Sequence, residues 1–311
     1  MFRKSPGVIR SILAAAAIVL AAGTTSAKAQ DTPESQDPIV LALAEWTGQH
    51  ITTYIAGNIL ERMGYNVEYV TAAYLPSATA IADGSITGSL EVWDNNLGEF
   101  FPKLISEGKI DEIGDTGLDA REGWLYPKHV EELCPGMPAW DAFLGCAELF
   151  AVAETFPNGR FLEYPADWGD RATQMIVSEG LPFDSIPAGS EGALVAELNA
   201  SIQKKSALVM MFWAPHWVLS NTETGWVDIP EDLVVKASMQ KPRTFKVVWP
   251  GAADKWPHAF KFLQAYQITN DVQEPLMDQI DNQGQDALEV TKKWVDENES
   301  VWQPMVDQAM M

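Results

Sequence analysis

The chain has 311 residues, of which 21 are Lys or Arg, 43 are Asp or Glu and 47% are hydrophobic, and its formal net charge is −22. This is the composition of a globular protein, and the length suits one large domain or two smaller ones. The acidic balance argues against nucleic acid or an anionic membrane as the partner, because both require clustered Lys and Arg. With 2 Cys, 4 His and no CxxC or HxxxH spacing, we expect no metal site and no cofactor. The count that stands out is 12 Trp, a residue enriched at recognition surfaces.

Residues 1–29 have the pattern of an export signal. A basic start containing Arg3 and Arg10 precedes the apolar run Ile12 to Ala22, and Ala27-Lys28-Ala29 is an A-x-A cleavage site. The apolar run is about half the length of a membrane span, so an uncleaved anchor is the less favoured alternative. Removal of the signal takes away four basic and no acidic residues, which leaves a net charge of −26. We expect a soluble periplasmic protein that begins near Gln30.

Cys134 and Cys146 are the only two cysteines, and they flank a loop rich in Pro and Gly. In an exported protein we interpret them as a disulfide that closes this loop, a link that contributes about 3 kcal/mol in the chain-entropy model. A pair of free catalytic thiols is the alternative, but no motif supports it.

Strand-like and helix-like segments alternate after a polar leader at 31–38. We predict strands at Ile39–Leu43, Val67–Val70, Ser89–Val92, Ala207–Phe212 and Thr244–Trp249. We predict helices at Gln49–Met63, Ser77–Asp83, Ala193–Gln203, Pro257–Tyr266, Gln273–Gln279 and Ala287–Glu297. This alternation predicts βαβ units and mostly parallel sheets.

The segments divide into two α/β lobes of similar size. Lobe 1 would comprise residues 38–126 plus 244–311, and lobe 2 residues 127–243. The chain would cross between the lobes near Trp124–Lys128 and again near Met239–Lys246. A cleft between two lobes is a place where a small ligand binds.

Three tryptophans stand at the ends of predicted strands. Trp46 lies three residues after the first strand, Trp93 directly after the third, and Trp213 directly after the buried strand of lobe 2. In open α/β sheets ligands bind just beyond the carboxyl ends of strands. These three residues, from two lobes, are therefore candidates for one cleft.

Two further tryptophans are candidates. Trp124 lies at the first predicted crossing, and Trp168 lies in a turn-rich segment in which Gly169 allows backbone N–H groups to approach a ligand closely. We interpret the others as core packing: Trp140, Trp217, Trp226, Trp249, Trp256, Trp294 and Trp302. Several indole faces around one point, in an acidic protein, suit a methylated cation. A quaternary ammonium donates no hydrogen bond, so ring quadrupoles are its best neutral partners, each worth about 0.5–2 kcal/mol.

Several segments match one family. They are Ile39–Trp46, the pair Gly64-Tyr65, Ala82–Ser85 before SLEVW, Glu122–Pro127, and Trp213-Ala-Pro-His-Trp217. On these segments the chain resembles the substrate-binding proteins of glycine betaine/choline-type ABC importers, and W-x-P-x-W is the most specific motif. The resemblance implies a two-lobed periplasmic-binding-protein (venus-flytrap) fold whose cleft encloses a methylated ammonium or sulfonium head group. It also implies an ABC importer permease as the membrane partner.

The resemblance assigns roles to individual residues. Trp46, Trp93 and Trp213 match aromatic-cage positions. Trp168, Gly169 and Asp170 look like the segment that, in betaine binders, supplies a Trp and backbone N–H donors to the ligand carboxylate.

Three positions depart from the family pattern. Choline binders have an acid where this chain has Gly48 and a cage Tyr where it has Glu122, and betaine binders have a His where it has Leu97. A carboxylate in the cleft would favour a cation or an N-oxide and would repel a betaine carboxylate. The alternative for Glu122 is a carboxylate on the hinge surface. Glycine betaine, trimethylamine N-oxide, choline, carnitine and dimethylsulfoniopropionate all remain open as ligands.

Other classes of protein are weighed against this one. A secreted hydrolase is one, with His216 near the cage or with Glu45 or Glu122 as a candidate glycosidase carboxylate, but no nucleophile motif supports it. A sugar- or peptide-binding import protein is another, because aromatic side chains also stack on sugars. A sensor's ligand-binding partner would use the same chemistry. We expect a monomer that is not an enzyme and that closes on its ligand by hinge motion.

Overall fold

The computed structural model describes residues 1–2 and 33–311. The predicted export signal lies, apart from residues 1–2, outside the described residues. From Pro33 onward the described residues belong to one compact unit. Within the described residues, no helix has the length and apolar character needed to cross a membrane.

The first sheet has five strands in the order β2-β1-β3-β10-β4. Its strands are β1 (Ile39–Leu43), β2 (Val67–Thr71), β3 (Gly88–Trp93), β4 (Asp111–Asp115) and β10 (Thr244–Val248). β1 pairs in parallel with β2 and β3, whereas β10 runs antiparallel to β3 and β4. We call this sheet with its helices lobe 1.

The second sheet repeats the arrangement in the order β7-β6-β8-β5-β9. Its strands are β5 (Arg121–Pro127), β6 (Gly159–Glu163), β7 (Phe183–Pro187), β8 (Val209–Ala214) and β9 (Thr224–Trp226). β6 pairs in parallel with β7 and β8, and β5 runs antiparallel to β8 and β9. The prediction of mostly parallel sheets is wrong for β5 and β10. The chain enters each of them from the other sheet, so no helical crossover forces a parallel direction.

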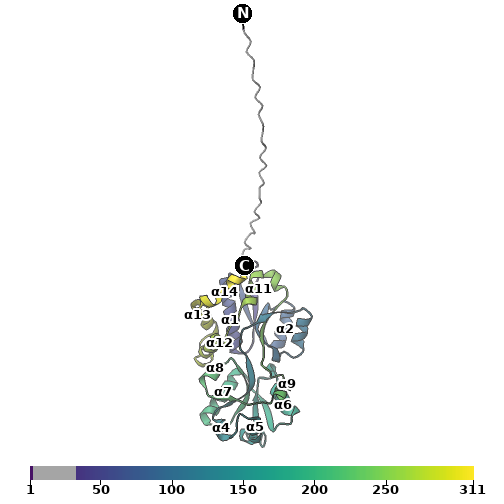
Figure 1. The fold of residues 1–311 in the computed structure, drawn as a ribbon, viewed down its shortest axis with the longest axis vertical. Helices are drawn as coiled ribbons and strands as arrows, with labels where there is room; N and C mark the ends of the chain where they lie inside the picture. Colours follow the sequence, from purple (N-terminus) through teal and green to yellow (C-terminus); the bar gives the residue numbers. More distant parts are fainter. Residues whose placement is uncertain (3–32) are drawn as a thin grey trace. The chain divides into compact units, whose positions relative to one another are not determined.

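Helices cover both faces of the first sheet. They are α1 (Thr47–Arg62), α2 (Tyr74–Ala82), α3 (Phe100–Ser106), α10 (Ala252–Lys255), α11 (Pro257–Ala265), α12 (Asn270–Met277), α13 (Ala287–Glu297) and α14 (Glu299–Ala309). In Figure 1, α1, α12 and α13 lie on one side of the sheet and α2 on the other. All six residues of β3 are buried as a result. Leu90 belongs to the hydrophobic cluster that contains residues of α1, and Val92 to the cluster that contains residues of α2 and α3.

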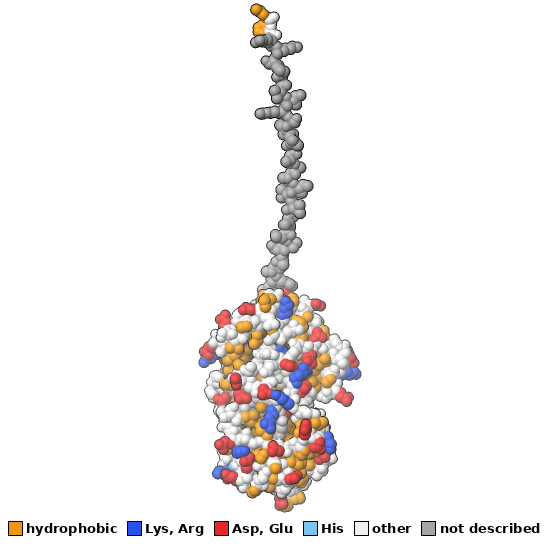
Figure 2. Space-filling view, viewed as in Figure 1, with side chains coloured by type: hydrophobic (Ala, Val, Ile, Leu, Met, Phe, Trp, Pro, Cys, Tyr) orange, Lys and Arg blue, Asp and Glu red, His pale blue; other side chains and the backbone are white. Residues whose placement is uncertain are grey.

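Apart from α7, the helices of lobe 2 have at most eight residues. They are α4 (Val130–Leu133), α5 (Trp140–Gly145), α6 (Arg171–Ser178), α7 (Glu191–Lys204), α8 (Trp217–Asn221) and α9 (Glu231–Lys236). The predicted disulfide is present: Cys134 and Cys146 are bonded, and they tie the end of α4 to the end of α5. Figure 2 shows acidic side chains scattered over both lobes on the face in view, not gathered in one patch.

Two connections join the lobes, and they lie side by side. The backbone N–H of Thr116, after β4, donates to the carbonyl of Thr244 in β10 at 3.0 Å, and the two threonine hydroxyls also form a hydrogen bond. β5 begins at Arg121 and pairs within the second sheet, although the sequence-based range assigned most of it to lobe 1. We therefore propose that the first lobe boundary lies between Asp115 and Arg121.

Candidate functional site

A cavity with about 280 Å³ of empty space lies where strand ends of the two sheets meet. It is lined by Trp46, Trp93, Glu122, Tyr164, Trp168 and Trp213. A ligand that fills it must be compact, and most of its surface must contact aromatic rings.

The strand ends explain why four tryptophans meet here. Trp46 follows β1 in extended conformation and precedes α1, Trp93 is the last residue of β3, and Trp213 lies near the end of β8. Trp168 ends the 3-10 helix η3 (Ala166–Trp168), and the next residue, Gly169, has a φ of +106°, which favours glycine. The structure thus brings together four of the five tryptophans predicted from the sequence, two from each lobe.

The rings contact one another at steep angles. The Trp46 and Trp168 centroids are 5.5 Å apart with an interplanar angle of 71°, and those of Trp168 and Trp213 are 5.6 Å apart at 77°. Tyr164, which the sequence did not single out, is 5.8 Å from Trp168 and 5.7 Å from Trp213. Such edge-to-face pairs of aromatic rings are favourable in themselves. Because the rings meet at steep angles, they form a concave site and not a flat surface.

A buried carboxyl group holds the two tryptophans of lobe 1. Glu91, only 1% exposed, accepts the indole N–H groups of Trp46 and Trp93 on Oε1, at 3.0 and 3.1 Å. Its Oε2 accepts from the Thr52 hydroxyl at 2.7 Å and from Nε2 of Gln273 at 2.9 Å. The sequence analysis missed Glu91. The alternation of SLEVW, which places residues 91 and 93 on one face of the strand, was the pattern that would have found it.

The same network accounts for the absence of a side chain at position 48, where the chain has Gly48. A Cβ at this position would lie 3.2 Å from the side-chain amide of Gln273, whose Nε2 donates to the Gly48 carbonyl at 2.9 Å. The position at which choline binders have an acid is here covered by a neutral amide.

Glu122 is buried and paired. Its Oε2 accepts from Arg171 Nη2 at 2.6 Å, its Oε1 accepts from the Tyr164 hydroxyl at 3.2 Å, and the Asn95 amide forms a further hydrogen bond. Burial raises the pKa of the Glu122 carboxyl, and the charge of Arg171 opposes this effect. Since Glu122 is 8% exposed, its interpretation as a hinge-surface carboxylate is wrong. Arg171 Nη1 also donates to the Asn95 carbonyl at 2.8 Å, which links lobe 2 to lobe 1.

Trp124, the fifth tryptophan predicted for the site, does not belong to the lining of the cavity. Trp124 is fully buried in lobe 2, with ring centroids 4.6 Å from Phe161, 5.6 Å from Trp140 and 5.7 Å from Phe143. It lies on the same face of β5 as Glu122 but two residues, about 7 Å, deeper in the sheet.

Gly169 and Asp170 do not belong to the lining of the cavity either. Asp170 is exposed and its Oδ1 accepts from Gln174 Nε2 at 2.6 Å, one turn further along α6. Glu45 is exposed as well, so it does not face Glu122 across the cavity as a glycosidase pair would.

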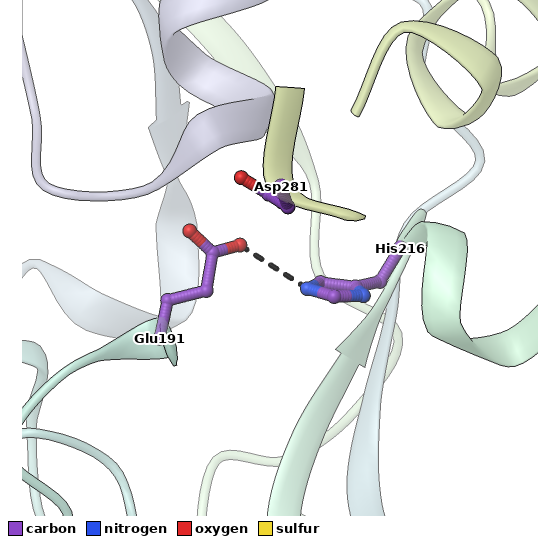
Figure 3. A group of neighbouring side chains, drawn as sticks. All are labelled: Glu191, His216 and Asp281. Carbon is purple, nitrogen blue, oxygen red and sulfur yellow. Dashed lines mark hydrogen bonds and ion pairs between the residues drawn. The ribbon is translucent and has the colours of Figure 1, made fainter. Parts of the chain in front are cut away.

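Glu191, His216 and Asp281 form a second polar cluster at the seam between the lobes (Figure 3). One potential ligand atom of each lies within 4.8 Å of the others, a spacing that would suit a metal ion. His216 Nδ1 accepts the N–H of Val218 at 3.2 Å, so the ring proton is on Nε2, which points to Glu191 Oε1 at 3.2 Å. A metal-binding His shows the opposite pattern, with its second nitrogen donating. The cluster is therefore a hydrogen-bond network.

This network joins the lobes next to the cavity. Thr47, which follows Trp46, donates its N–H to Glu191 Oε2 at 2.9 Å and its hydroxyl to Asp281 Oδ1 at 2.6 Å. The indole of Trp217 donates to Asp281 Oδ2 at 3.1 Å. Burial and the charge of Glu191 raise the pKa of Asp281 to about 6.

The sequence matches a known protein family over most of its length. Residues 37–297 match the family described as the substrate binding domain of ABC-type glycine betaine transport systems. The chain is 33% identical over 191 residues to the trimethylamine N-oxide-binding protein of Pelagibacter ubique, a match that covers 59% of this chain and 61% of the relative. It is 24% identical over 113 residues to a glycine betaine/carnitine transport binding protein, GbuC, of Listeria monocytogenes, covering 36% of each. The chain thus spans less than two thirds of the length of either relative.

Solved structures show the same fold. The glycine betaine/L-proline-binding protein ProX of Borrelia burgdorferi has a TM-score of 0.73 at 19% identity, covering 88% of this chain and 100% of that one. Lactococcal OpuAC in its closed form with glycine betaine has a TM-score of 0.71 at 17% identity, with the same coverage. A choline-binding protein in complex with choline has a TM-score of 0.73 at 18% identity, covering 90% and 100%. The two-lobed periplasmic-binding-protein fold predicted from the sequence is confirmed.

The pairing of Glu122 with Arg171 gives a testable pH dependence. Arg171→Met would leave a buried carboxylate without its cation, which costs about 3–5 kcal/mol of unfolding free energy. The folded-state pKa of Glu122, already above its unfolded value, would rise further. The free energy of unfolding of the variant would then fall as the pH rises from the unfolded-state pKa towards the folded-state pKa of Glu122. The loss of unfolding free energy relative to wild type should therefore be larger at pH 7.5 than at pH 5.

Urea unfolding of both proteins at the two pH values measures this effect. Arg160→Met is the matched control, because Arg160 forms an ion pair with Glu197 at 2.6 Å on the surface and should contribute at most about 1 kcal/mol. An equal loss at both pH values, or a loss no larger than in the control, would show that Arg171 does not compensate Glu122.

Proposed function

We propose that this chain, which belongs to the family of substrate-binding domains of ABC-type glycine betaine transport systems, is a periplasmic binding protein for a methylated onium solute. The observation that carries the proposal is the cavity lined by four tryptophans, two from each lobe. The bound solute would be handed to an importer permease in the membrane, with no cofactor and with the binding protein acting as a monomer.

The chemistry of the lining fits a trimethylated head group. Such a group carries a diffuse positive charge, has no N–H to donate, and presents methyl groups on every side but one. Ring faces attract the charge, and the rings also bury the methyl surface. A sugar, in contrast, needs several hydrogen-bonding groups, and the polar groups of the lining are few: the Glu122 carboxyl and the Tyr164 hydroxyl.

Trimethylamine N-oxide is our first candidate for the ligand. It is the compound named for the 33%-identical relative, and it is the smallest of the five candidate ligands. Its single oxygen accepts hydrogen bonds, and Tyr164 or a protonated Glu122 would donate to it. Burial favours that protonated form by raising the pKa of Glu122. A betaine carboxylate placed at the same point would meet a second carboxyl group.

We further propose that ligand binding closes the two lobes about the paired connections at Thr116 and Thr244. Contacts across the seam support this: Thr47 to Glu191, Trp217 to Asp281, and Arg171 to the Asn95 carbonyl. Because each lobe supplies half of the tryptophans, a complete cage exists only when the lobes are together. The closed form would then be the one that docks on the permease.

Isothermal titration calorimetry of the mature protein against an onium panel tests the function. The panel contains trimethylamine N-oxide, glycine betaine, choline, carnitine and dimethylsulfoniopropionate, with maltose and a dipeptide mixture as controls. We expect a dissociation constant on the order of micromolar for trimethylamine N-oxide, about 8 kcal/mol of binding free energy, and none for the controls. Binding of a sugar or peptide in place of every onium compound, or turnover of an onium compound, would contradict the proposal.

The cage itself is tested by truncation of one wall in each lobe. Trp93→Ala and Trp213→Ala should each weaken binding at least tenfold, about 1.4 kcal/mol, because each removes one ring face from the cation. Trp294→Ala is the matched control, since Trp294 lies on α13 beside a separate pocket, and its affinity should stay within twofold. Retained affinity in both cage variants would place the ligand elsewhere.

A further inference from the structure

Glu91 is not part of the cavity lining, yet it contacts two of its walls. One oxygen of the carboxyl group receives the indole N–H groups of both Trp46 and Trp93, at 3.0 and 3.1 Å. Each indole therefore stands between the cavity and the same carboxyl group. The proposed function uses the faces of these rings and leaves open why both N–H groups converge on one acidic residue.

The hydrogen-bonding pattern of Glu91 is that of a negative charge. Four donors occupy its two oxygens, which is the capacity of an ionised carboxyl group. All four donors are neutral: two indoles, the Thr52 hydroxyl and the Gln273 amide. Glu122, the acidic residue that does line the cavity, has the opposite environment, because Arg171 lies 2.6 Å away and balances its charge. Among the described residues, Glu91 is thus the carboxylate that contacts two walls of the cage and forms no ion pair.

We propose that Glu91 determines the preference of the cage for a positively charged head group over an uncharged one of the same shape. A hydrogen bond from an indole N–H to an anion polarises the ring and adds electron density to its faces. The attraction of a cation to the ring depends on that density, and the charge of Glu91 adds to it directly in a site from which water is excluded. An uncharged tert-butyl group of the same shape gains nothing from either effect.

The same residue fixes where the two rings stand. With Oε1 shared by Trp46 and Trp93, and with Oε2 held by Thr52 and Gln273, the carboxyl group has no freedom to turn. A variant that keeps the shape of Glu91 but removes its charge separates the two roles. If Glu91 only positioned the rings, this variant would alter the binding of charged and uncharged ligands alike. If its charge attracts the ligand, the variant would weaken the binding of charged ligands alone.

Glu91→Gln in the mature protein tests the inference, which rests on the proposed function. The probes are three isosteric pairs that differ in the central atom of the head group: trimethylamine N-oxide with tert-butanol, choline with 3,3-dimethyl-1-butanol, and glycine betaine with 3,3-dimethylbutanoate. Affinities are measured by calorimetry, and weak binders by competition at millimolar concentration. We expect the onium member of each pair to bind at least tenfold more weakly to the variant, and its carbon isostere to change less than twofold.

Two further variants serve as controls. Glu163→Gln neutralises another buried carboxyl group, one that accepts the N–H groups of Tyr164 and Thr173 at 3.0 and 2.9 Å, and it should leave the onium-to-isostere ratio within twofold. Thr52→Val removes one donor from Glu91 Oε2 but leaves its charge and both indole bonds, and it should also preserve the ratio.

A spectrum of the ligand-free protein provides a readout independent of affinity. In a ¹H–¹⁵N spectrum of the indole groups, the N–H protons of Trp46 and Trp93 should move upfield in Glu91→Gln, while those of the other tryptophans stay in place and report a folded protein. If wild type binds no onium probe, the proposed function fails. If wild type binds them but Glu91→Gln leaves the ratio unchanged, or weakens both members of a pair equally, the inference about Glu91 alone is overturned.

Discussion

An indole ring can face a cation only if its N–H group finds an acceptor on the side away from the ligand, because a buried donor without a partner is costly. In lobe 1 this requirement is met for two rings at once by the single carboxyl group of Glu91. Other features of lobe 1 follow from it. Thr52 and Gln273 hold the second carboxyl oxygen, and residue 48 is a glycine because the Gln273 amide occupies the space beside it. The cage wall of lobe 1 therefore presents aromatic rings to the cavity, and a polar network holds these rings on the side away from the cavity.

Lobe 2 builds its half of the cage around the other buried acid. Glu122 is held by Arg171 and by the hydroxyl of Tyr164, whose ring contacts both Trp168 and Trp213. Because Arg171 balances its charge, Glu122 attracts a cation less than an unpaired carboxylate would, whereas its protonated form, which burial favours, can donate a hydrogen bond to a ligand oxygen. The two acids then have separate tasks, with attraction of the head group assigned to Glu91 and recognition of the polar end to Glu122. Contacts of Thr47 with Glu191 and Asp281 connect the cage to the closing of the lobes.

Much of the architecture was predictable from local patterns. The strand that precedes each of Trp46, Trp93 and Trp213 could be read from the sequence, and the rule that ligands bind at strand ends then placed three walls of the cage. Trp124 was misplaced because a residue's position along a strand, and not only its face, decides whether it reaches the sheet edge. The antiparallel direction of β5 and β10 was not predicted, because it depends on which lobe the chain comes from. Gln273 and Arg171 could not be assigned at all, since their partners Glu91 and Glu122 are 182 and 49 positions away in the sequence.

The most direct test of the account is a crystal structure of the mature protein with trimethylamine N-oxide. We predict methyl carbons in van der Waals contact with the rings of Trp46, Trp93, Trp168 and Trp213, and the oxygen within hydrogen-bond distance of Glu122 or Tyr164. A ligand bound outside this cavity, or bound with its methyl groups away from the four rings, would contradict the central claim.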